Sequence, residues 1–219
     1  MKSFSHQKFV LLASGFLGAF MLLSCSMLSV NARAGNDLVS RGRKVFLENC
    51  QACHQKDAEG QPGVAPSLTN KEFLSIASDR FLTETIRNGR PGTAMVGFGD
   101  TVDIKAIIAY LRSYAQLPYR GDIIDDPSKA QGDAEIGEVI FRRVCENCHG
   151  VNGAGYETGG SGPAIGKKGF LDVATDSFIR ATVKEGRSNT KMRGFSGPEG
   201  LANLTDQEIN DVITYMRTL

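Results

Sequence analysis

Residues 50–54 read CQACH and residues 145–149 read CENCH, so the pattern C-x-x-C-H occurs twice in a chain of 219 residues. The sequence around the two copies repeats as well, first at an offset of 95 and, beyond the glycine-rich stretch 151–162, at an offset of 97. The matched pairs include Gly42 with Gly137, Phe46 with Phe141, Pro66 with Pro163, Arg90 with Arg187 and Met95 with Met192. Such self-similarity predicts two copies of one domain.

The pattern C-x-x-C-H is the attachment signature of c-type haem. One helical turn places the two thiols where they add to the two vinyl groups of one porphyrin, and the next residue projects an imidazole toward the iron. Two copies therefore predict two covalently attached c-type haems, one in each repeat. The attachment residues would be Cys50, Cys53, Cys145 and Cys148, and the first iron ligands His54 and His149.

A single CxxC would also suit a redox-active dithiol or half of a zinc site. A thioredoxin-like dithiol is expected in a βαβ setting, which this sequence does not show. Structural zinc sites usually join cysteine pairs that lie much closer in sequence than these two pairs do. Two copies in matched contexts favour haem attachment over both alternatives.

The sixth ligand of each iron follows by elimination. The chain has three histidines, and the one outside the motifs, His6, lies near the N-terminus. Met95 and Met192 occupy matched positions in the loops NGRPGTAMVGF and EGRSNTKMRGF. A methionine is more often a packing residue than a ligand, which is our prediction for Met216. The matched positions favour ligation by Met95 and Met192, and His/Met ligation raises the haem potential.

Apolar spacing predicts helices near the start and end of each repeat, over residues 38–49, 102–114, 136–144 and 206–219. In the last of these, Thr205 and Glu208 have the spacing of a capping box. Between the helices, Pro, Gly and Ser indicate long loops, with a short helical stretch over residues 78–88. Two prolines and three aspartates mark residues 117–132 as a linker.

The sequence over roughly 38–219 resembles class I cytochromes c twice over, in particular dihaem members with tandem domains such as the dihaem subunits of some bacterial respiratory oxidases. The resemblance implies an all-α fold of two small haem-wrapping domains, at residues 35–116 and 133–219, after an N-terminal segment 1–34. It also implies that the carbonyls of Pro66 and Pro163 accept hydrogen bonds from the haem-ligating imidazoles, which orients the rings and tunes the iron.

One further expectation follows from that resemblance, and another from the matched arginines of the two repeats. In each domain the first helix would cross the last, with Gly42 and Phe46 against Tyr110, and the matched residues of the second repeat against Tyr215. Arg90 and Arg187 are candidates to contact haem propionates. The alternative for both arginines is an ordinary solvated side chain.

The first 34 residues resemble a targeting segment, with a positive start followed by a long apolar run. Three outcomes are open: cleavage after Ala34, lipidation at Cys25 within a lipobox-like stretch, or retention of the apolar run as a membrane anchor. Each of them places the rest of the chain in the periplasm or elsewhere outside the cytoplasm. Membrane association is expected if Cys25 is lipidated or the apolar segment is retained.

These features favour electron transfer, with redox proteins as donor and acceptor and with the chain as a free carrier or a subunit of a membrane oxidoreductase complex. A formal net charge of +1 gives no reason to expect a nucleic-acid partner. Residues 165–195 hold seven Lys/Arg and three Asp/Glu, whereas the matched 68–98 hold four and three, which would favour an acidic partner near the second haem. The alternative class is a dihaem enzyme, a peroxidase or a thiosulfate-oxidising cytochrome. A peroxidase needs an open position on the iron, and a thiosulfate-oxidising cytochrome needs a cysteine ligand.

Overall fold

The computed structural model describes residues 35–219. The N-terminal segment 1–34, with Cys25 and the cleavage signal at Ala34, lies outside the described residues. Within 35–219 no helix is both long and apolar enough to cross a membrane.

The described part of the chain is built from helices and loops, with isolated bridges in place of strands. The first repeat holds a helix over residues 35–49, α2 (Gln51–His54), α3 (Lys71–Ile76), α4 (Asp79–Asn88) and α5 (Ile104–Arg112). The second holds α7 (Ala134–Val144), α8 (Glu146–His149), η1 (Val151–Gly153), η2 (Gly155–Thr158), α9 (Lys168–Leu171), α10 (Asp176–Glu185) and α11 (Asp206–Met216). The predicted all-α fold of two related domains is confirmed, while α3, α9 and α10 fall where long loops were expected.

Matched capping residues explain why α4 and α10 begin at equivalent positions. The hydroxyls of Ser78 and Thr175 accept hydrogen bonds from the backbone N–H groups three residues on. Both helices end at a glycine with positive φ, Gly89 or Gly186, where a side chain would collide with the loop that carries Met95 or Met192. The predicted capping box at the start of α11 is also present.

In each domain the first helix crosses the last at a glycine. A Cβ atom added at Gly42 would lie 1.8 Å from the carbonyl oxygen of Ala106, and one added at Gly137 would lie 2.0 Å from that of Asp211. Backbone approaches this close exclude any side chain, which is why these positions need glycine. Beside each crossing an aromatic pair fills the core, with ring centroids 5.3 Å apart for Phe46–Tyr110 and 5.4 Å apart for Phe141–Tyr215. The expected crossings are confirmed.

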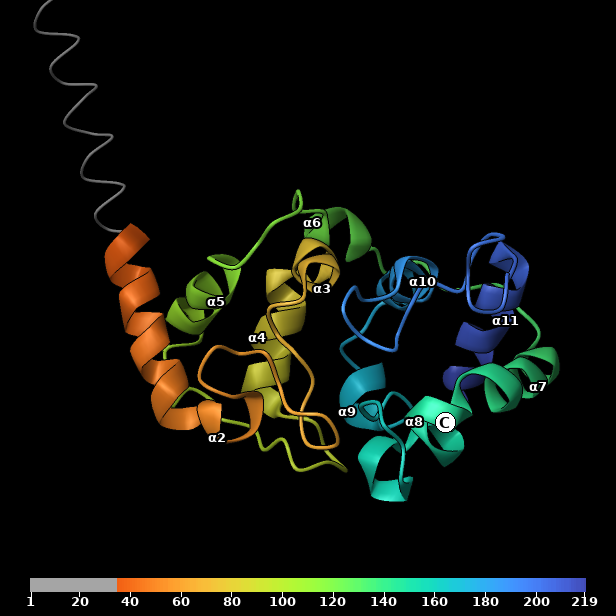
Figure 1. The fold of residues 1–219 in the computed structure, drawn as a ribbon, viewed down its shortest axis with the longest axis horizontal. Coiled ribbons are helices and arrows are strands. Elements are labelled where there is room, and N and C mark those ends of the chain that lie inside the picture. The colour runs from red at the N-terminus through yellow and green to blue at the C-terminus, as the bar shows by residue number, and fades with distance from the viewer. Residues whose placement is uncertain (1–34) are drawn as a thin grey trace, which may run out of the picture.

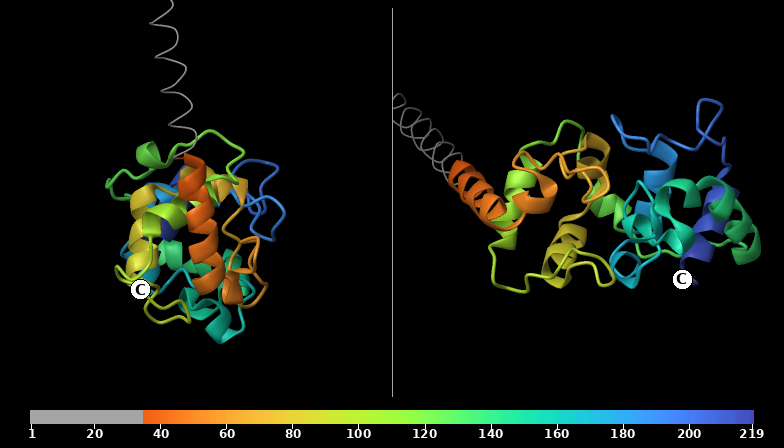
Figure 2. Two further views of the ribbon diagram at one scale, coloured as in Figure 1. Left: turned by 90° about the vertical axis from the view of Figure 1, so that its left-hand side faces the viewer. Right: turned by 60° about the horizontal axis from the view of Figure 1, so that its bottom comes forward.

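The two domains lie side by side along the long axis of the molecule, with the crossed helix pairs at opposite ends (Figures 1 and 2). They meet near the middle, where the rings of Phe81 and Phe178 stack with centroids 4.5 Å apart. These two residues are equivalent in the duplication. Because the same residue from each repeat meets its counterpart, the interface is approximately two-fold symmetric, as in an isologous dimer.

Residues 117–132 were predicted to be a linker, and the structure shows that they pack against both domains. The segment holds the short helix α6 (Gly121–Ile124), drawn between α3 and α10 in Figure 1. Arg120 makes two hydrogen bonds to Glu185 of α10, at 3.0 and 2.6 Å. Asp125 accepts a 2.7 Å hydrogen bond from Nε of Arg80 in α4. The segment therefore holds the two domains together as well as connecting them.

Candidate functional site

Both C-x-x-C-H motifs line one cavity, which has a volume of about 2560 Å³ and is bounded by residues of both domains. In each domain the motif forms a short turn of helix directly after the first long helix. The backbone N–H of His54 donates to Cys50 O at 3.0 Å, and that of His149 donates to Cys145 O at 2.9 Å. This turn places both cysteines and the histidine of each motif at the cavity wall.

The two motif histidines are held in the same way. Nδ1 of His54 lies 3.0 Å from the carbonyl oxygen of Pro66, and Nδ1 of His149 lies 2.8 Å from that of Pro163. A carbonyl oxygen only accepts, so each Nδ1 carries the proton and each Nε2 keeps its lone pair. Burial lowers the pKa of both imidazoles, which favours this neutral form. A neutral imidazole with one nitrogen fixed by a hydrogen bond is suited to ligate a metal through the other.

The cysteines of the two motifs differ from those of redox-active dithiols. Burial, with a smaller contribution from the neighbouring cysteine of each pair, raises the pKa of Cys50 to about 11 and that of Cys145 to about 12. Dithiol oxidoreductases depend instead on a lowered thiol pKa, because the thiolate is the nucleophile. These surroundings disfavour the dithiol alternative.

Met95 and Met192 line the same cavity from matched loops. The N–H of Phe98 donates to Ile86 O at 3.0 Å, and that of the matched Phe195 donates to Val183 O at 2.9 Å. Each loop is thereby fastened to the helix before it, so that both methionines are only partly exposed. Their role as iron ligands stays a prediction. Met216 is buried, as expected for a packing residue, and its side chain also reaches the cavity.

Arg90 and Arg187 lie where the two domains meet and are not ordinary solvated arginines. Cζ of Arg90 lies 5.0 Å from the ring centroid of Phe81 in its own domain and 5.3 Å from that of Phe170 in the other. Cζ of Arg187 is placed equivalently, 5.9 Å from Phe178 and 5.8 Å from Phe73. Each cation is therefore close to an aromatic ring from each domain.

The polar contacts of the two arginines differ. Arg90 donates across the interface to the carbonyl oxygen of Gly169, at 2.7 Å. Arg187 donates to the hydroxyl of Thr182 at 2.7 Å and to a backbone carbonyl within its own domain. Burial lowers the pKa of each guanidinium to about 10. Within residues 35–219 neither guanidinium forms an ion pair with a carboxylate, although both line the cavity.

One polar group at the cavity was not found from the sequence. The hydroxyl of Thr85 is buried and is the side-chain polar group without a hydrogen-bond partner in the described residues. Its counterpart in the second repeat is Thr182, which accepts from Arg187. The offset of 97 that pairs these threonines also pairs Phe81 with Phe178. The duplication in the sequence could therefore have pointed to both pairs as equivalent residues.

These residues fit a haem in each half of the cavity. The imidazoles present a free Nε2, the cysteines lie in the same turn, and a methionine lies on the wall of each domain. An unpartnered hydroxyl at Thr85 and two guanidinium groups without a carboxylate partner are the groups that acidic haem substituents would satisfy.

Comparisons with known proteins agree with this geometry. Residues 37–111 match the family model described as "Cytochrome C oxidase, cbb3-type, subunit III", and residues 134–219 match the model "Cytochrome c". The chain is 31% identical over 186 residues to the cbb3-type cytochrome c oxidase subunit CcoP of Rubrivivax gelatinosus, covering 81% of this chain and 53% of that protein. It is 43% identical over 91 residues to subunit FixP of Bradyrhizobium sp. (strain ORS 278), covering 40% of this chain and 31% of that protein.

Two more distant likenesses also cover most of the chain. The cytochrome bc1 complex cytochrome c subunit of Mycobacterium leprae is 24% identical over 225 residues, which is 95% of this chain and 71% of that protein. A solved structure, the Kuenenia stuttgartiensis reducing HAO-like protein complex Kustc0457/Kustc0458, has a TM-score of 0.48 at 18% identity, covering 81% of this chain and 94% of that one. The chain spans about half the length, or less, of the oxidase subunits named above.

Two cytochrome c domains in one chain, each with its own attachment motif, make this a tandem-domain c-type cytochrome. Two such domains carry two covalently bound c-type haems.

Proposed function

We propose that this chain transfers electrons in a respiratory chain and that it passes them between its own two haems. The observation that carries the proposal is the single cavity shared by the two domains, which both attachment motifs and both loop methionines line. The relatives that match most of the chain are named as subunits of cbb3-type oxidase and bc1 complexes, which supports a respiratory role.

In this proposal each domain holds one haem by a matched set of side chains. Cys50, Cys53, Cys145 and Cys148 would form the thioether bonds, His54 and Met95 would ligate the first iron, and His149 and Met192 would ligate the second. When bound, the haems supply iron that cycles between ferric and ferrous. The carbonyls of Pro66 and Pro163 would fix the imidazoles, and with Met95 and Met192 as the second ligands neither iron would have room for a substrate.

Arg90 and Arg187 are proposed to bind haem propionates at the interface. Each guanidinium lies against rings from both domains and keeps N–H groups free for an anion. The unpartnered hydroxyl of Thr85 would donate to a propionate of the first haem. Cations in this position neutralise propionate charge in a partly buried site, which a solvated arginine would not do as effectively.

The stacked rings of Phe81 and Phe178 have a separate role in the proposal. They pack the two domains into a fixed relative position, and the contacts of Arg120 and Asp125 reinforce it. A fixed distance between the two haems in turn fixes the rate at which electrons pass from one to the other. The protein then acts as a two-site relay between a donor and an acceptor.

The partners in this proposal are redox proteins, one of them part of a membrane oxidoreductase complex. The location is the periplasm or another extracytoplasmic compartment, with residues 1–34 as export signal or anchor. Intact mass and N-terminal sequencing of the purified native protein should show a start at Gly35, a lipidated Cys25 or a retained apolar segment. A haem-loaded cytoplasmic protein that keeps Met1 would contradict export.

The test of electron transfer is a redox titration of the parent and of two axial variants, after a pyridine haemochrome assay has shown two c-type haems per chain. Met95→His should lower the potential of the first haem and leave the second nearly unchanged, and Met192→His should do the reverse, because histidine is the harder axial ligand. The parent should be low-spin at both irons and should bind carbon monoxide poorly. A high-spin iron in the resting parent, or turnover of peroxide or thiosulfate at enzymatic rates, would favour the enzyme alternative.

A further inference from the structure

Three exposed cations of the second domain, Arg143, Lys191 and Arg193, line the haem cavity or lie next to a residue that does, and we call them the basic rim. Arg143 lies two residues before the first attachment cysteine, and Lys191 and Arg193 flank Met192 on either side. Arg143 and Lys191 both line the cavity. The rim therefore borders the cavity on its cysteine side and on its methionine side.

The three cations of the basic rim are not neutralised by ion pairs in the described part of the chain, whereas nearby lysines are. Lys167 contacts Glu157 at 2.9 Å and Lys168 contacts Asp172 at 3.2 Å. The acids within six residues of a rim cation are Glu138, Glu146, Glu185 and Glu199, of which Glu138 pairs with Arg142 and Glu185 with Arg120. Hydrogen bonds from Thr205, with a smaller contribution from Arg143, lower the pKa of Glu208. None of these carboxylates forms an ion pair with a rim cation within residues 35–219, so the three rim side chains stay free to meet an acidic surface.

The first domain has no such rim, although its backbone is built in the same way. The residues equivalent to Arg143, Lys191 and Arg193 are Glu48, Ala94 and Val96. All three of these are exposed, and Val96 is 67% exposed. The duplication therefore supplies an internal control, in which equivalent cavity mouths differ by four charges at three positions.

From this difference we infer that the second domain docks an acidic redox protein over its haem cavity through Arg143, Lys191 and Arg193, and that the first domain does not. The inference rests on the proposed function, since it names the chemistry of one electron-transfer partner. Complementary charge around a site raises the rate of encounter and orients the partner. The first domain, with Glu48, Ala94 and Val96 at these positions, offers an acidic surface no comparable attraction.

The experiment isolates one haem at a time. In Met95→His the first haem has a lowered potential, so ascorbate reduces the second haem alone, and Met192→His isolates the first haem in the same way. Oxidation of the reduced haem is followed by stopped flow with ferricyanide as an anionic oxidant and tris(phenanthroline)cobalt(III) as a cationic one. The ferricyanide rate at the second haem should fall steeply as salt is added, because salt screens the rim, while that at the first haem should change little.

Matched exchanges between the domains sharpen the test, because each new residue is the one that the other domain carries at that position. Lys191→Ala with Arg193→Val should slow ferricyanide oxidation of the second haem about tenfold at low salt, a change at the lower end of typical steering effects. The reverse pair, Ala94→Lys with Val96→Arg, should speed oxidation of the first haem by a similar factor. Redox titration of each variant checks that the driving force has not changed.

Poly-L-glutamate serves as an acidic probe that is as large as a protein. It should protect the second haem of the parent from ferricyanide, and the Lys191→Ala/Arg193→Val variant should lose that protection. Salt-independent rates, equal protection of both haems, or exchanges without effect would overturn the inference. Failure of the proposed function would be distinguishable, because reversible reduction of the haems would then itself be missing.

Discussion

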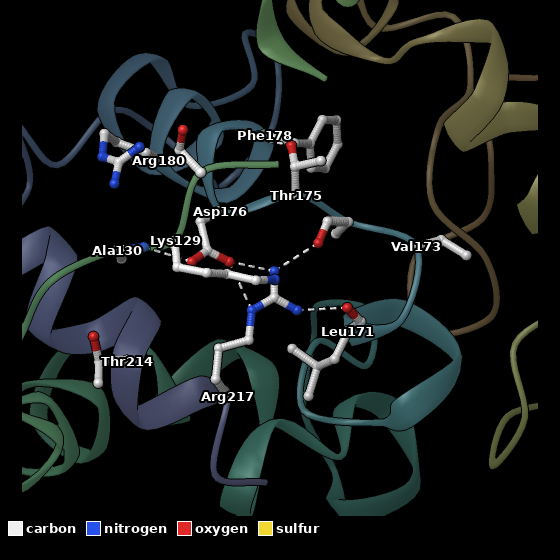
Figure 3. Close-up of polar contacts among 12 residues, drawn as sticks. Lys129, Ala130, Leu171, Val173, Thr175, Asp176, Phe178, Arg180, Thr214 and Arg217 are labelled. Atoms are coloured by element: carbon white, nitrogen blue, oxygen red, sulfur yellow. Dashed lines mark hydrogen bonds and ion pairs between the residues drawn. The ribbon is translucent and has the colours of Figure 1, made fainter. Parts of the chain in front are cut away.

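In each domain one arginine bonds two backbone carbonyl oxygens and one carboxylate, an arrangement that we call the arginine clamp. The two clamps differ in how far the carboxylate is buried. In the second domain Arg217 bonds the carbonyl oxygens of Leu171 and Ala174 and the carboxylate of Asp176 (Figure 3). In the first domain Arg112 makes the equivalent contacts, including an ion pair with Asp79. The side chain of Asp176 is 2% exposed, whereas that of Asp79 is 66% exposed.

The difference comes from the segment that connects the domains. The backbone N–H of Ala130 donates to Asp176 at 2.7 Å, which covers that carboxylate (Figure 3). On the first domain the same segment places the ring of Tyr119 over Arg112 instead, 4.6 Å from its Cζ, and leaves Asp79 in solvent. Identical side chains at equivalent positions therefore contribute differently to the free energy of unfolding, because their burial depends on which other segments pack over them.

The largest expected effect comes from removing the clamp arginine in each domain. Arg217→Leu leaves the buried carboxylate of Asp176 without its cation and should destabilise the second domain by about 3–5 kcal/mol. Arg112→Leu should cost less, because Asp79 stays hydrated. Urea unfolding, with hydrogen exchange resolved by domain, measures both costs.

Asp79→Ala is the matched control for the clamp comparison. An ion pair with an exposed carboxylate contributes about 0–1 kcal/mol, so this variant should unfold almost as the parent does. Equal destabilisation by Arg217→Leu and Arg112→Leu would show that burial of the carboxylate is not what separates the two clamps.

A smaller effect is expected from the threonines at the haem cavity. Thr182→Val removes the hydroxyl that accepts from Arg187 and should cost about 1.5–3 kcal/mol, the usual range for a hydrogen bond to a charged group. Thr85→Val removes a hydroxyl that has no protein partner, so it should change stability little. If that hydroxyl donates to a propionate, the same variant should lower the potential of the first haem.

Urea unfolding and redox titration of the two threonine variants separate these effects. Thr85→Ser keeps a hydroxyl and is the control for the potential, which it should leave near that of the parent. A potential for the first haem that is the same in Thr85→Val and the parent would rule out the proposed contact with a propionate.

The smallest effect concerns the contact of the connecting segment with α4, and it depends on pH. The hydrogen bond from Arg80 holds the pKa of Asp125 below its usual value near 3.8. A carboxyl whose folded-state pKa is lowered contributes stability above its unfolded pKa and loses it as pH falls through the folded pKa. Asp125→Asn should therefore cost about 0.5–1 kcal/mol at pH 7, since Arg80 is partly exposed, and progressively less below about pH 4. A difference from the parent that stays constant between pH 7 and pH 3 would contradict this.

The sequence alone predicted the duplicated all-α fold and the attachment, ligand and arginine residues of the candidate site, but not Thr85 or Thr182. The spacing of the motif residues was enough to identify them, because haem attachment requires two cysteines and a histidine within one helical turn. The duplication also presents each motif residue twice. The crossing at Gly42 followed from the family resemblance. The short helices α3 and α9 were missed because one or two turns carry too little periodicity to stand out among Gly, Pro and Ser.

Tertiary structure alone decided how the two halves are placed and where they differ. Phe81 and Phe178 have the pattern of ordinary core residues, and only the docking of the domains stacks them on each other. Residues 117–132 have the composition of a linker, yet their contacts bury Asp176 and join α4 to α10. Local sequence specifies helix turns and ligand spacing, because those depend on neighbours in the chain. Burial depends on residues that are distant in sequence and become neighbours only when the chain has folded. The contribution of each charged group to stability therefore depends on them as well.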